Sequence, residues 1–498
     1  MSLNRTLAAA LAAALPFAAT AETAITVYSS ATPGSLDARN FRNGGNGNIV
    51  PGYALVREDR TFDLKAGRTL LRINDVPAYI DPTTVSFSSL TDPAHTRVVE
   101  QSFEFDLTST EKLLSRYLDR DITVEQTRGQ TVETVNGTLV GAQDSLILKQ
   151  TDGTVRIMPL GSSIKLPSLP GGLISKPTLV WDVETSTTGA QKARFTYQTG
   201  GMTWWTDYNF TYSEPKAGAC KLDVSAWVTL VNQSGASFND AKLKLVAGDV
   251  QRAQPEPQRM MRAEAKMMAP ASPAAGFQEK AFFEYHLYTL GRPTSLAQNS
   301  TKQLELFPAV LNVSCEKSMV YYGQGYRPNY YGSPVIDRDP GVQSNKKVDV
   351  YLSLKNTKEN GLGVPLPAGR IRVAQLDAAD KSLEFIGEDV IQHTARDERV
   401  SVKLGSAFDV VGERRQTDFH IDTTAKWIEE EIEVKVRNRK ETETVSVDVR
   451  ESLYRWSNWT VTKKTSEFVK DDARTIHFPV KIAPGGEAVV RYTVRYTW

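Results

Sequence analysis

The residue types that most often carry out catalysis are scattered along this chain. Its five histidines, at positions 95, 286, 393, 420 and 477, show neither the spacing of metal ligands nor the His-Glu-x-x-His pattern of zinc hydrolases. Sequences typical of a serine nucleophile, a phosphate-binding loop or a dinucleotide-binding turn are absent too. Catalytic carboxylates carried by separate strands would leave no such local pattern. The sequence therefore predicts no metal and no cofactor, and it leaves open an enzyme whose acidic residues meet only in the fold.

Half of the eight methionines lie in one stretch of the chain. This stretch, 252–278, is rich in Pro, Ala, Gln and Met and contains Met260, Met261, Met267 and Met268. Thioether sulfur is a ligand that selects Cu(I), so a copper site is one interpretation. The favoured interpretation is a flexible loop, because the stretch has too little apolar surface to form a packed structure.

Aromatic side chains form a second candidate group. Exposed aromatic faces can bind sugar rings, whereas tryptophan in a β-sandwich more often fills the core. A tyrosine-rich stretch is therefore a candidate glycan-binding loop, and core packing is the favoured alternative for the tryptophans. The candidate ligand-binding residues are Tyr321, Tyr322, Tyr326, Tyr330 and Tyr331, and the tryptophans are Trp204, Trp205, Trp456 and Trp459.

The N-terminal residues have the pattern of an export signal. A short segment with one positive charge, Met1–Arg5, precedes the apolar run Leu7–Ala19. The small residues Ala19 and Ala21 then fit the rule for signal-peptide cleavage. We expect cleavage after Ala21 and a location in the periplasm or outside the cell.

The chain contains two cysteines, Cys220 and Cys315. In an oxidising compartment such a pair is expected to form one disulfide. The alternative is two buried free thiols, because the sequence does not show whether their Cα atoms come close enough.

Charge is balanced, with 59 Lys and Arg residues against 58 Asp and Glu. This balance and the lack of long basic runs argue against nucleic acid or an anionic membrane surface as a partner. The sequence also contains no stretch after the signal that is long and apolar enough for a transmembrane helix.

After residue 21 the sequence has the two-residue period of β-strands almost throughout, which predicts a mainly β, multi-domain protein. Thr108 and Glu111 form a capping box that predicts one short helix, and five short strands should follow between 122 and 166. That pattern is typical of an SH3-like or Sm-like barrel. We expect an N-terminal β region over 22–107, the small barrel inserted over 108–167, a β-sandwich over 168–345 and an immunoglobulin-like sandwich over 346–498.

The end of the chain alternates strictly between two kinds of side chain. Val490, Tyr492, Val494, Tyr496 and Trp498 share one face of the expected strand. The last strand of an outer-membrane barrel has a similar pattern. The helix, the long loops and the charges on other strands favour the edge strand of a soluble sandwich instead.

Several short sequences occur in an order that resembles the bacterial domain of unknown function 4139. They are GGMTWWTDY at 200–208, WVTLVNQSG at 227–235, AKLKLVAG at 241–248, EYHLY at 284–288 and YRWSNW at 454–459. The resemblance covers roughly the last two thirds of the chain. It implies a β-rich protein of the cell envelope and brings no catalytic residue with it. Some relatives carry a coiled-coil insertion that this sequence lacks, so no role of that coil is implied here.

These observations together favour an exported envelope protein without enzymatic activity, which binds or scaffolds other envelope proteins or glycans. The alternative is a carbohydrate-active or other hydrolytic enzyme. A cleft with two facing carboxylates would favour the enzyme, because a scaffold has no reason to keep one.

Overall fold

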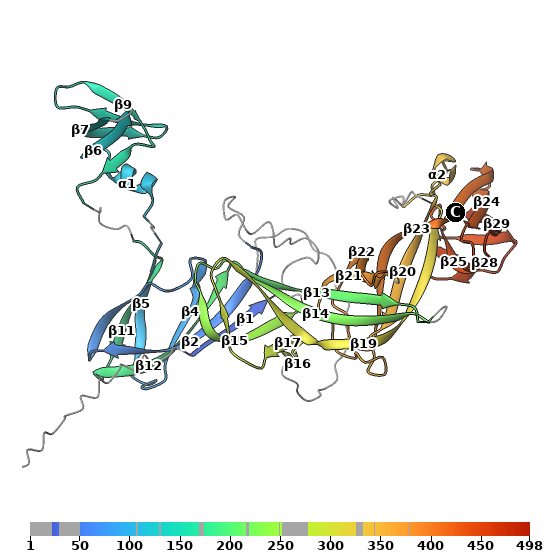
Figure 1. The fold of residues 1–498 in the computed structure, drawn as a ribbon, viewed down its shortest axis with the longest axis horizontal. Coiled ribbons are helices and arrows are strands. Elements are labelled where there is room, and N and C mark those ends of the chain that lie inside the picture. Colours follow the sequence, from blue (N-terminus) through green and yellow to red (C-terminus); the bar gives the residue numbers. More distant parts are fainter. Residues whose placement is uncertain are drawn as a thin grey trace, which may run out of the picture.

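The computed structural model describes residues 22–28, 50–105, 108–128, 131–168, 174–215, 219–248, 250, 277–324, 332–342, 344–377 and 379–498. The described chain is mainly β and contains several sheets, as predicted. It is elongated, with a small module around α1 (Thr110–Arg116) at one end and the C-terminal strands at the other (Figure 1). Within the described residues, no helix has the length and apolar character that crossing a bilayer requires.

An eight-stranded sheet joins segments that lie far apart in the sequence. The first strand runs parallel to β15, with Ala24 opposite Lys242, and antiparallel to β2. The predicted N-terminal β region therefore shares a sheet with residues beyond 168. The strand order is β16 (Phe277–Phe282), β17 (Tyr285–Leu290), β15 (Phe238–Ala247), β1 (Glu22–Tyr28), β2 (Tyr53–Leu64), β12 (Gly189–Gly200) and β4 (Ile80–Ser89), and β18 (Thr294–Leu296) also pairs with β15.

A three-stranded sheet packs against the end of this sheet. Its order is β3 (Gly67–Ile73), β11 (Thr178–Thr185) and β5 (Arg97–Glu104). Trp181 of β11 is fully buried between the two sheets, and the ring centroids of Phe87 and Phe195 lie 5.3 and 5.4 Å from its own. Among the described strands, β4 and β5 are each the last strand of their sheet.

The small module consists of α1 and a five-stranded sheet, as the sequence predicts. The first strand of this sheet, β6, pairs with the last, β10. The predicted cap is wrong by one residue, because Ser109 and not Thr108 is the N-cap and accepts a hydrogen bond from the backbone N–H of Lys112 at 3.2 Å. The strand order is β10 (Ser163–Lys165), β6 (Asp121–Arg128), β7 (Thr131–Ala142), β8 (Ser145–Lys149) and β9 (Val155–Pro159).

A thirteen-stranded sheet runs along the rest of the molecule. Its main path is β22 (Leu383–Ile391), β21 (Gly369–Leu376), β13 (Met202–Ser213), β14 (Lys221–Asn232), β19 (Ser300–Tyr322), β20 (Lys347–Lys355), β23 (Arg399–Asp422), β24 (Trp427–Asn438), β29 (Glu487–Thr497) and β26 (Trp459–Lys464). The branch strands are β25 (Val445–Ser452), β27 (Val469–Lys470) and β28 (Thr475–Ile482). The second short helix, α2 (Asp339–Val342), precedes β20.

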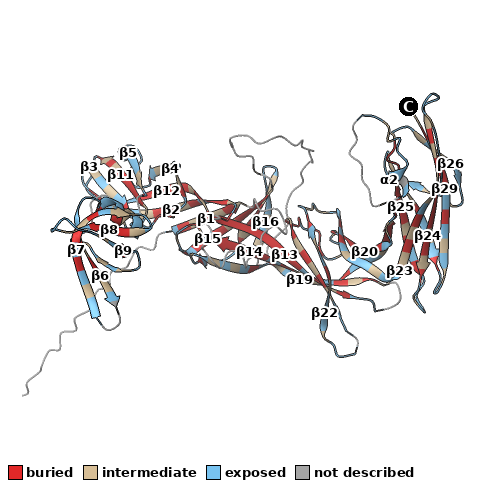
Figure 2. Ribbon diagram, turned by 90° about the horizontal axis from the view of Figure 1, so that it is seen from above, coloured by how far each residue is buried: buried red, intermediate tan, exposed pale blue. Residues whose placement is uncertain are grey.

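Two large hydrophobic cores lie along this sheet, and the long strand β19 contributes to both. Leu306 belongs to the first core, whereas Met319 belongs to the second. Val373 and Val402 also pack in the first core, so the expected boundary at 345/346 does not coincide with the boundary between the cores. Figure 2 shows buried residues interleaved with exposed ones along the strands, as expected of sheets packed on one face.

The last strand is not an edge strand, so that expectation is wrong. β29 pairs with β24 on one side and with β26 on the other. Its apolar face packs in the second core, where Tyr492, Val494 and Tyr496 are buried.

Candidate functional site

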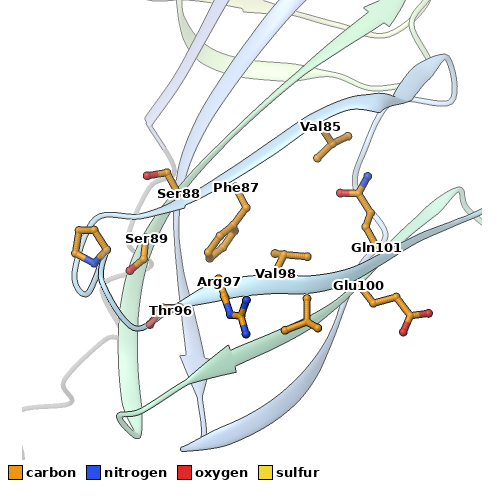
Figure 3. Close-up of a pocket in the computed structure, with 11 residues that line it drawn as sticks. Val85, Phe87, Ser88, Ser89, Thr96, Arg97, Val98, Glu100 and Gln101 are labelled. Carbon is orange, nitrogen blue, oxygen red and sulfur yellow. The ribbon is translucent and has the colours of Figure 1, made fainter.

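A slot opens between the two edge strands β4 and β5. It has a volume of about 540 Å³, within the range of small-molecule and side-chain binding pockets. Figure 3 shows Phe87 of β4 and Val98 of β5 pointing into the space between the strands. Both side chains also pack against the first hydrophobic core, so the slot leads from solvent toward the buried ring of Trp181.

One end of the slot is closed by an amide. Gln101 donates a hydrogen bond to the carbonyl of Pro82 on β4 at 2.8 Å and accepts one from the indole of Trp181 at 2.9 Å. This side chain fixes the distance between the two edge strands at that end. The other end is lined by hydroxyl-bearing residues, Ser88, Ser89 and Thr96.

A β-bulge makes β5 unusual beside the slot. The register with β11 shifts between Val98 and Glu100, so that these two residues have partners in β11 and Val99 between them does not. In a regular strand two consecutive side chains point to opposite faces, but a bulge redirects one of them. Val98 and Val99 both line the slot, and Val99 is 45% exposed.

The charge at the mouth of the slot is largely compensated. The guanidinium of Arg97 forms an ion pair with Glu184 of β11 at 2.8 Å. Both side chains are exposed, so the pair contributes little to stability. Glu100 also lines the slot and interacts electrostatically with Arg68, so charges of both signs lie near the mouth and no cluster of like charges forms there. The slot therefore suits an uncharged occupant better than an ionic one.

Two ion pairs are buried in the second core, at the opposite end of the molecule. Arg414 of β23 pairs with Glu451 of β25, and Arg455 pairs with Glu430 of β24, each with an N–O distance of 2.9 Å. All four side chains are at most 2% exposed. Burial by itself would lower the pKa of Arg414, but the interactions with Glu451, Tyr492 and Glu430 together outweigh this effect, and the pKa lies above its ordinary value.

Tyrosine hydroxyls also donate hydrogen bonds to these carboxylates. Tyr492 donates a hydrogen bond to Glu451 at 2.6 Å, and Tyr496 donates one to Glu430 at 3.3 Å. Burial, reinforced by the neighbouring carboxylates, raises the pKa of both tyrosines. Burial likewise raises the pKa of three tyrosines in the first core, namely Tyr197, Tyr208 and Tyr288. We call these residues the five core tyrosines.

Arg455 also fastens the segment that follows the tyrosine-rich stretch. Its guanidinium donates hydrogen bonds to the carbonyls of Val335 and Asp337 at 3.0 and 2.7 Å. The backbone N–H of Val335 in turn donates to the carbonyl of Arg455. The buried cluster thus has a clear structural role, because it ties a long connection to the sandwich.

The structure separates the predicted ligand-binding tyrosines. Tyr321 is fully buried in the second core, and burial raises its pKa to about 12, so its ring faces no solvent. Tyr322 is partly buried, with the guanidinium of Arg450 6.0 Å from its ring centroid. Tyr326, Tyr330 and Tyr331 lie outside the described residues, as do the four clustered methionines and the proposed cleavage site after Ala21.

The tryptophans behave mainly as core residues. Trp204 is fully buried, and Trp205 is 8% exposed and donates its indole N–H to Asp207 at 2.9 Å. Trp456 and Trp459 are partly buried and pack against the second core. Core packing, the favoured alternative, therefore describes the first pair fully and the second in part.

Cys220 and Cys315 form a disulfide, with their Cα atoms 5.0 Å apart. It joins the residue before β14 to the middle of β19, within the first core. In the described part of the chain, no group of three His, Cys, Asp or Glu side chains is arranged to hold a metal ion.

Sequence reasoning missed both the slot and the buried ion pairs. The ion pairs do have a signal, because Glu430 shares the buried face of its strand with Ile428 and Ile432. Glu451 likewise continues the buried series of Val447 and Val449. The slot has no local signal, since it depends on how two sheets diverge.

Comparisons of the chain with protein-family models, with curated proteins and with solved structures find no match.

Proposed function

We propose that the chain is an exported cell-envelope protein that binds or scaffolds other envelope components without catalysing a reaction. The observation that carries this proposal is the slot between β4 and β5, a concave site of mixed polarity on a rigid β framework. Recognition sites commonly combine apolar side chains with polar groups that orient the ligand. In the slot Phe87, Val98 and Val99 provide the apolar contact, and polar groups make up the larger part of the exposed lining.

The buried carboxylates argue for binding rather than hydrolysis. Glycosidases use one carboxyl group as an acid and another as a base or nucleophile, and both must reach the substrate. Glu430 and Glu451 lie in a sandwich core, each held by an arginine and a tyrosine. A polymer such as a glycan strand has no path to carboxylates that are at most 2% exposed.

Two features support export. The N-terminal residues have the charge and apolar pattern of a signal peptide. The Cys220–Cys315 disulfide is the kind of bond that persists in an oxidising compartment. A periplasmic or secreted location is therefore part of the proposal.

The test is chemical cross-linking of intact bacterial cells, followed by fractionation of the envelope. We expect the chain to be released with the soluble periplasmic or secreted fraction and to be cross-linked reproducibly to other envelope components. Retention in the cytoplasm, or the absence of any cross-linked component, would overturn the proposal.

The enzyme alternative needs its own measurement. Purified protein is incubated with peptidoglycan and with envelope polysaccharides, and released fragments are quantified for the wild type, Glu430→Gln and the control Glu431→Gln. We expect no hydrolysis by any of them. Hydrolysis that Glu430→Gln abolishes while stability is retained would establish the enzyme and refute the binding function.

A further inference from the structure

The slot lies between two strands that each form the edge of a sheet. Among the described strands, β4 ends the eight-stranded sheet and β5 ends the three-stranded sheet, so each has a neighbour on one side only. A strand edge of this kind is a template for another extended chain, because its N–H and C=O groups repeat at the spacing of a β-strand.

β5 is the better template of the two. β4 contains Pro82, which has no N–H to donate. β5 contains no proline, and from Glu100 to Glu104 it pairs with β11 in an unbroken register. A regular ladder on one side of a strand implies regularly placed main-chain groups on its other side.

The slot also supplies an apolar contact beside this edge. The side chains of Phe87, Val98 and Val99 line it, and the first two continue into the first core. An incoming strand places every second side chain on one face. One or two apolar side chains of such a strand can therefore enter the slot while its backbone pairs with β5.

A peptide fits these observations better than a glycan. Phe87 is the one aromatic residue among those that line the slot, and its ring already forms a T-shaped pair with Trp181, with the centroids 5.3 Å apart, so the slot offers no broad aromatic platform for a sugar ring. Arg97 is paired with Glu184, and Glu100 interacts with Arg68, so no cluster of like charges at the mouth would select a charged segment. Paired strand edges offer alternating donors and acceptors, which match a peptide backbone.

We propose that the slot between β4 and β5 is a strand-addition site for an extended, uncharged segment of a partner envelope protein with apolar residues at alternate positions. The segment pairs with the edge of β5 from Glu100 to Glu104 and inserts apolar side chains over Phe87 and Val98. This inference rests on the proposed binding function and specifies its ligand class.

The experiment selects peptides and then asks how they bind. Purified full chain is used to select from a displayed library of random eight-residue peptides, the length of β5. The most enriched peptide is synthesised, and its affinity is measured by calorimetry for the wild type, for Val99→Lys and for the control Val390→Lys. Val390 is 41% exposed on another edge strand, β22, and so matches Val99 in type, exposure and setting.

We expect enriched peptides with apolar residues at alternate positions. Val99→Lys should weaken binding about tenfold, because a charge replaces apolar contact at the mouth, while Val390→Lys should leave binding unchanged. Methylation of one backbone nitrogen that faces β5 should weaken binding about fivefold, whereas methylation of the next nitrogen should not. Because Val99 is half-exposed, its variant is expected to fold, and its thermal unfolding is measured alongside.

Four results would overturn the inference. They are a selection that enriches no peptide, peptides whose affinity is unaffected by Val99→Lys, affinity that is insensitive to backbone methylation, and displacement of the peptide by soluble peptidoglycan fragments. Self-association of the purified chain that Val99→Lys abolishes would also overturn it, because the occupant would be a second copy. If envelope components are still cross-linked to the Val99→Lys protein in cells as to the wild type, this inference fails while the proposed function stands.

Discussion

Replacing Glu451 by Gln tests whether the buried Arg414–Glu451 pair contributes as its geometry predicts. The substitution preserves the size of the side chain and removes its negative charge. Arg414, whose side chain is 1% exposed, then keeps its positive charge in the core after the carboxylate that it pairs with has been neutralised. Breaking a buried pair in this way costs about 3–5 kcal/mol, because the remaining charge loses its paired carboxylate and is still shielded from water.

The double variant separates this effect from simple loss of packing. Arg414→Met leaves Glu451 as the unpaired charge and should cost a similar amount. Combining Arg414→Met with Glu451→Gln removes both charges, so we expect the double variant to be more stable than either single variant. The exposed pair Arg399–Glu316 is the matched control, and Glu316→Gln should cost less than about 1 kcal/mol.

Hydrogen exchange followed by mass spectrometry is the suitable assay, because a chain with several cores does not unfold in one step. Amides of β24 and β25 report on the second core directly. Glu451→Gln should accelerate their exchange between about 100-fold and 5,000-fold, which corresponds to the expected loss of stability. If the two single variants add up in the double variant, the side chains do not act as a pair and the reasoning is wrong.

Three further predictions follow from buried groups and close contacts. The five core tyrosines have a raised pKa in the folded state, so their stabilisation is complete below the unfolded-state value near 10 and is lost as pH rises above it. Each tyrosine lowers the free energy of unfolding by about 1.4 kcal/mol per pH unit in that range. The denaturant concentration at the midpoint of unfolding should therefore be steady between pH 7 and 9 and fall steeply above about pH 10. A midpoint that stays constant up to pH 11 would contradict this prediction. Replacing both Cys220 and Cys315 by Ala removes a disulfide between residues 95 positions apart and should lower the free energy of unfolding by about 4–5 kcal/mol on the chain-entropy model. The expected result is a lower melting temperature of the first core, and a reductant should have no further effect on the variant. Gly412→Ala should lower the melting temperature, because the added Cβ would lie 2.1 Å from the ring of Tyr321, whereas Gly161→Ala meets nothing within 4 Å and should be neutral; equal effects would refute the packing argument.

Local patterns in the sequence were informative wherever the determining interaction is local. The two-residue alternation predicted the mainly β fold, because one buried face imposes that period on every strand. The short helix before five strands was predicted from a cap and an apolar stripe, and only the capping residue was displaced by one position. The two cysteines were predicted to pair, and they do.

Domain boundaries were harder, because they depend on which distant strands pair. The parallel pairing of β1 with β15 joins residues more than 200 positions apart and has no signal in either segment. The long strands β19 and β23 show a similar limit, since a continuous strand can change its packing partner without a change in its own pattern. The two cores therefore divide the chain at places where the sequence shows no linker.

The sequence by itself determined the class of fold and the likeness of the N-terminus to an export signal, since these depend on composition and short-range pattern. It favoured a disulfide between the two cysteines, which the structure then showed. Only the tertiary structure decided which residues meet. It buried Tyr321, it placed Glu430 and Glu451 beside arginines in a core, and it left a slot where β4 and β5 diverge. The physical reason is that the burial of a residue and the exposure of a strand edge depend on which strands pair in a sheet. The local sequence of a strand does not specify its partners, which can lie far away along the chain.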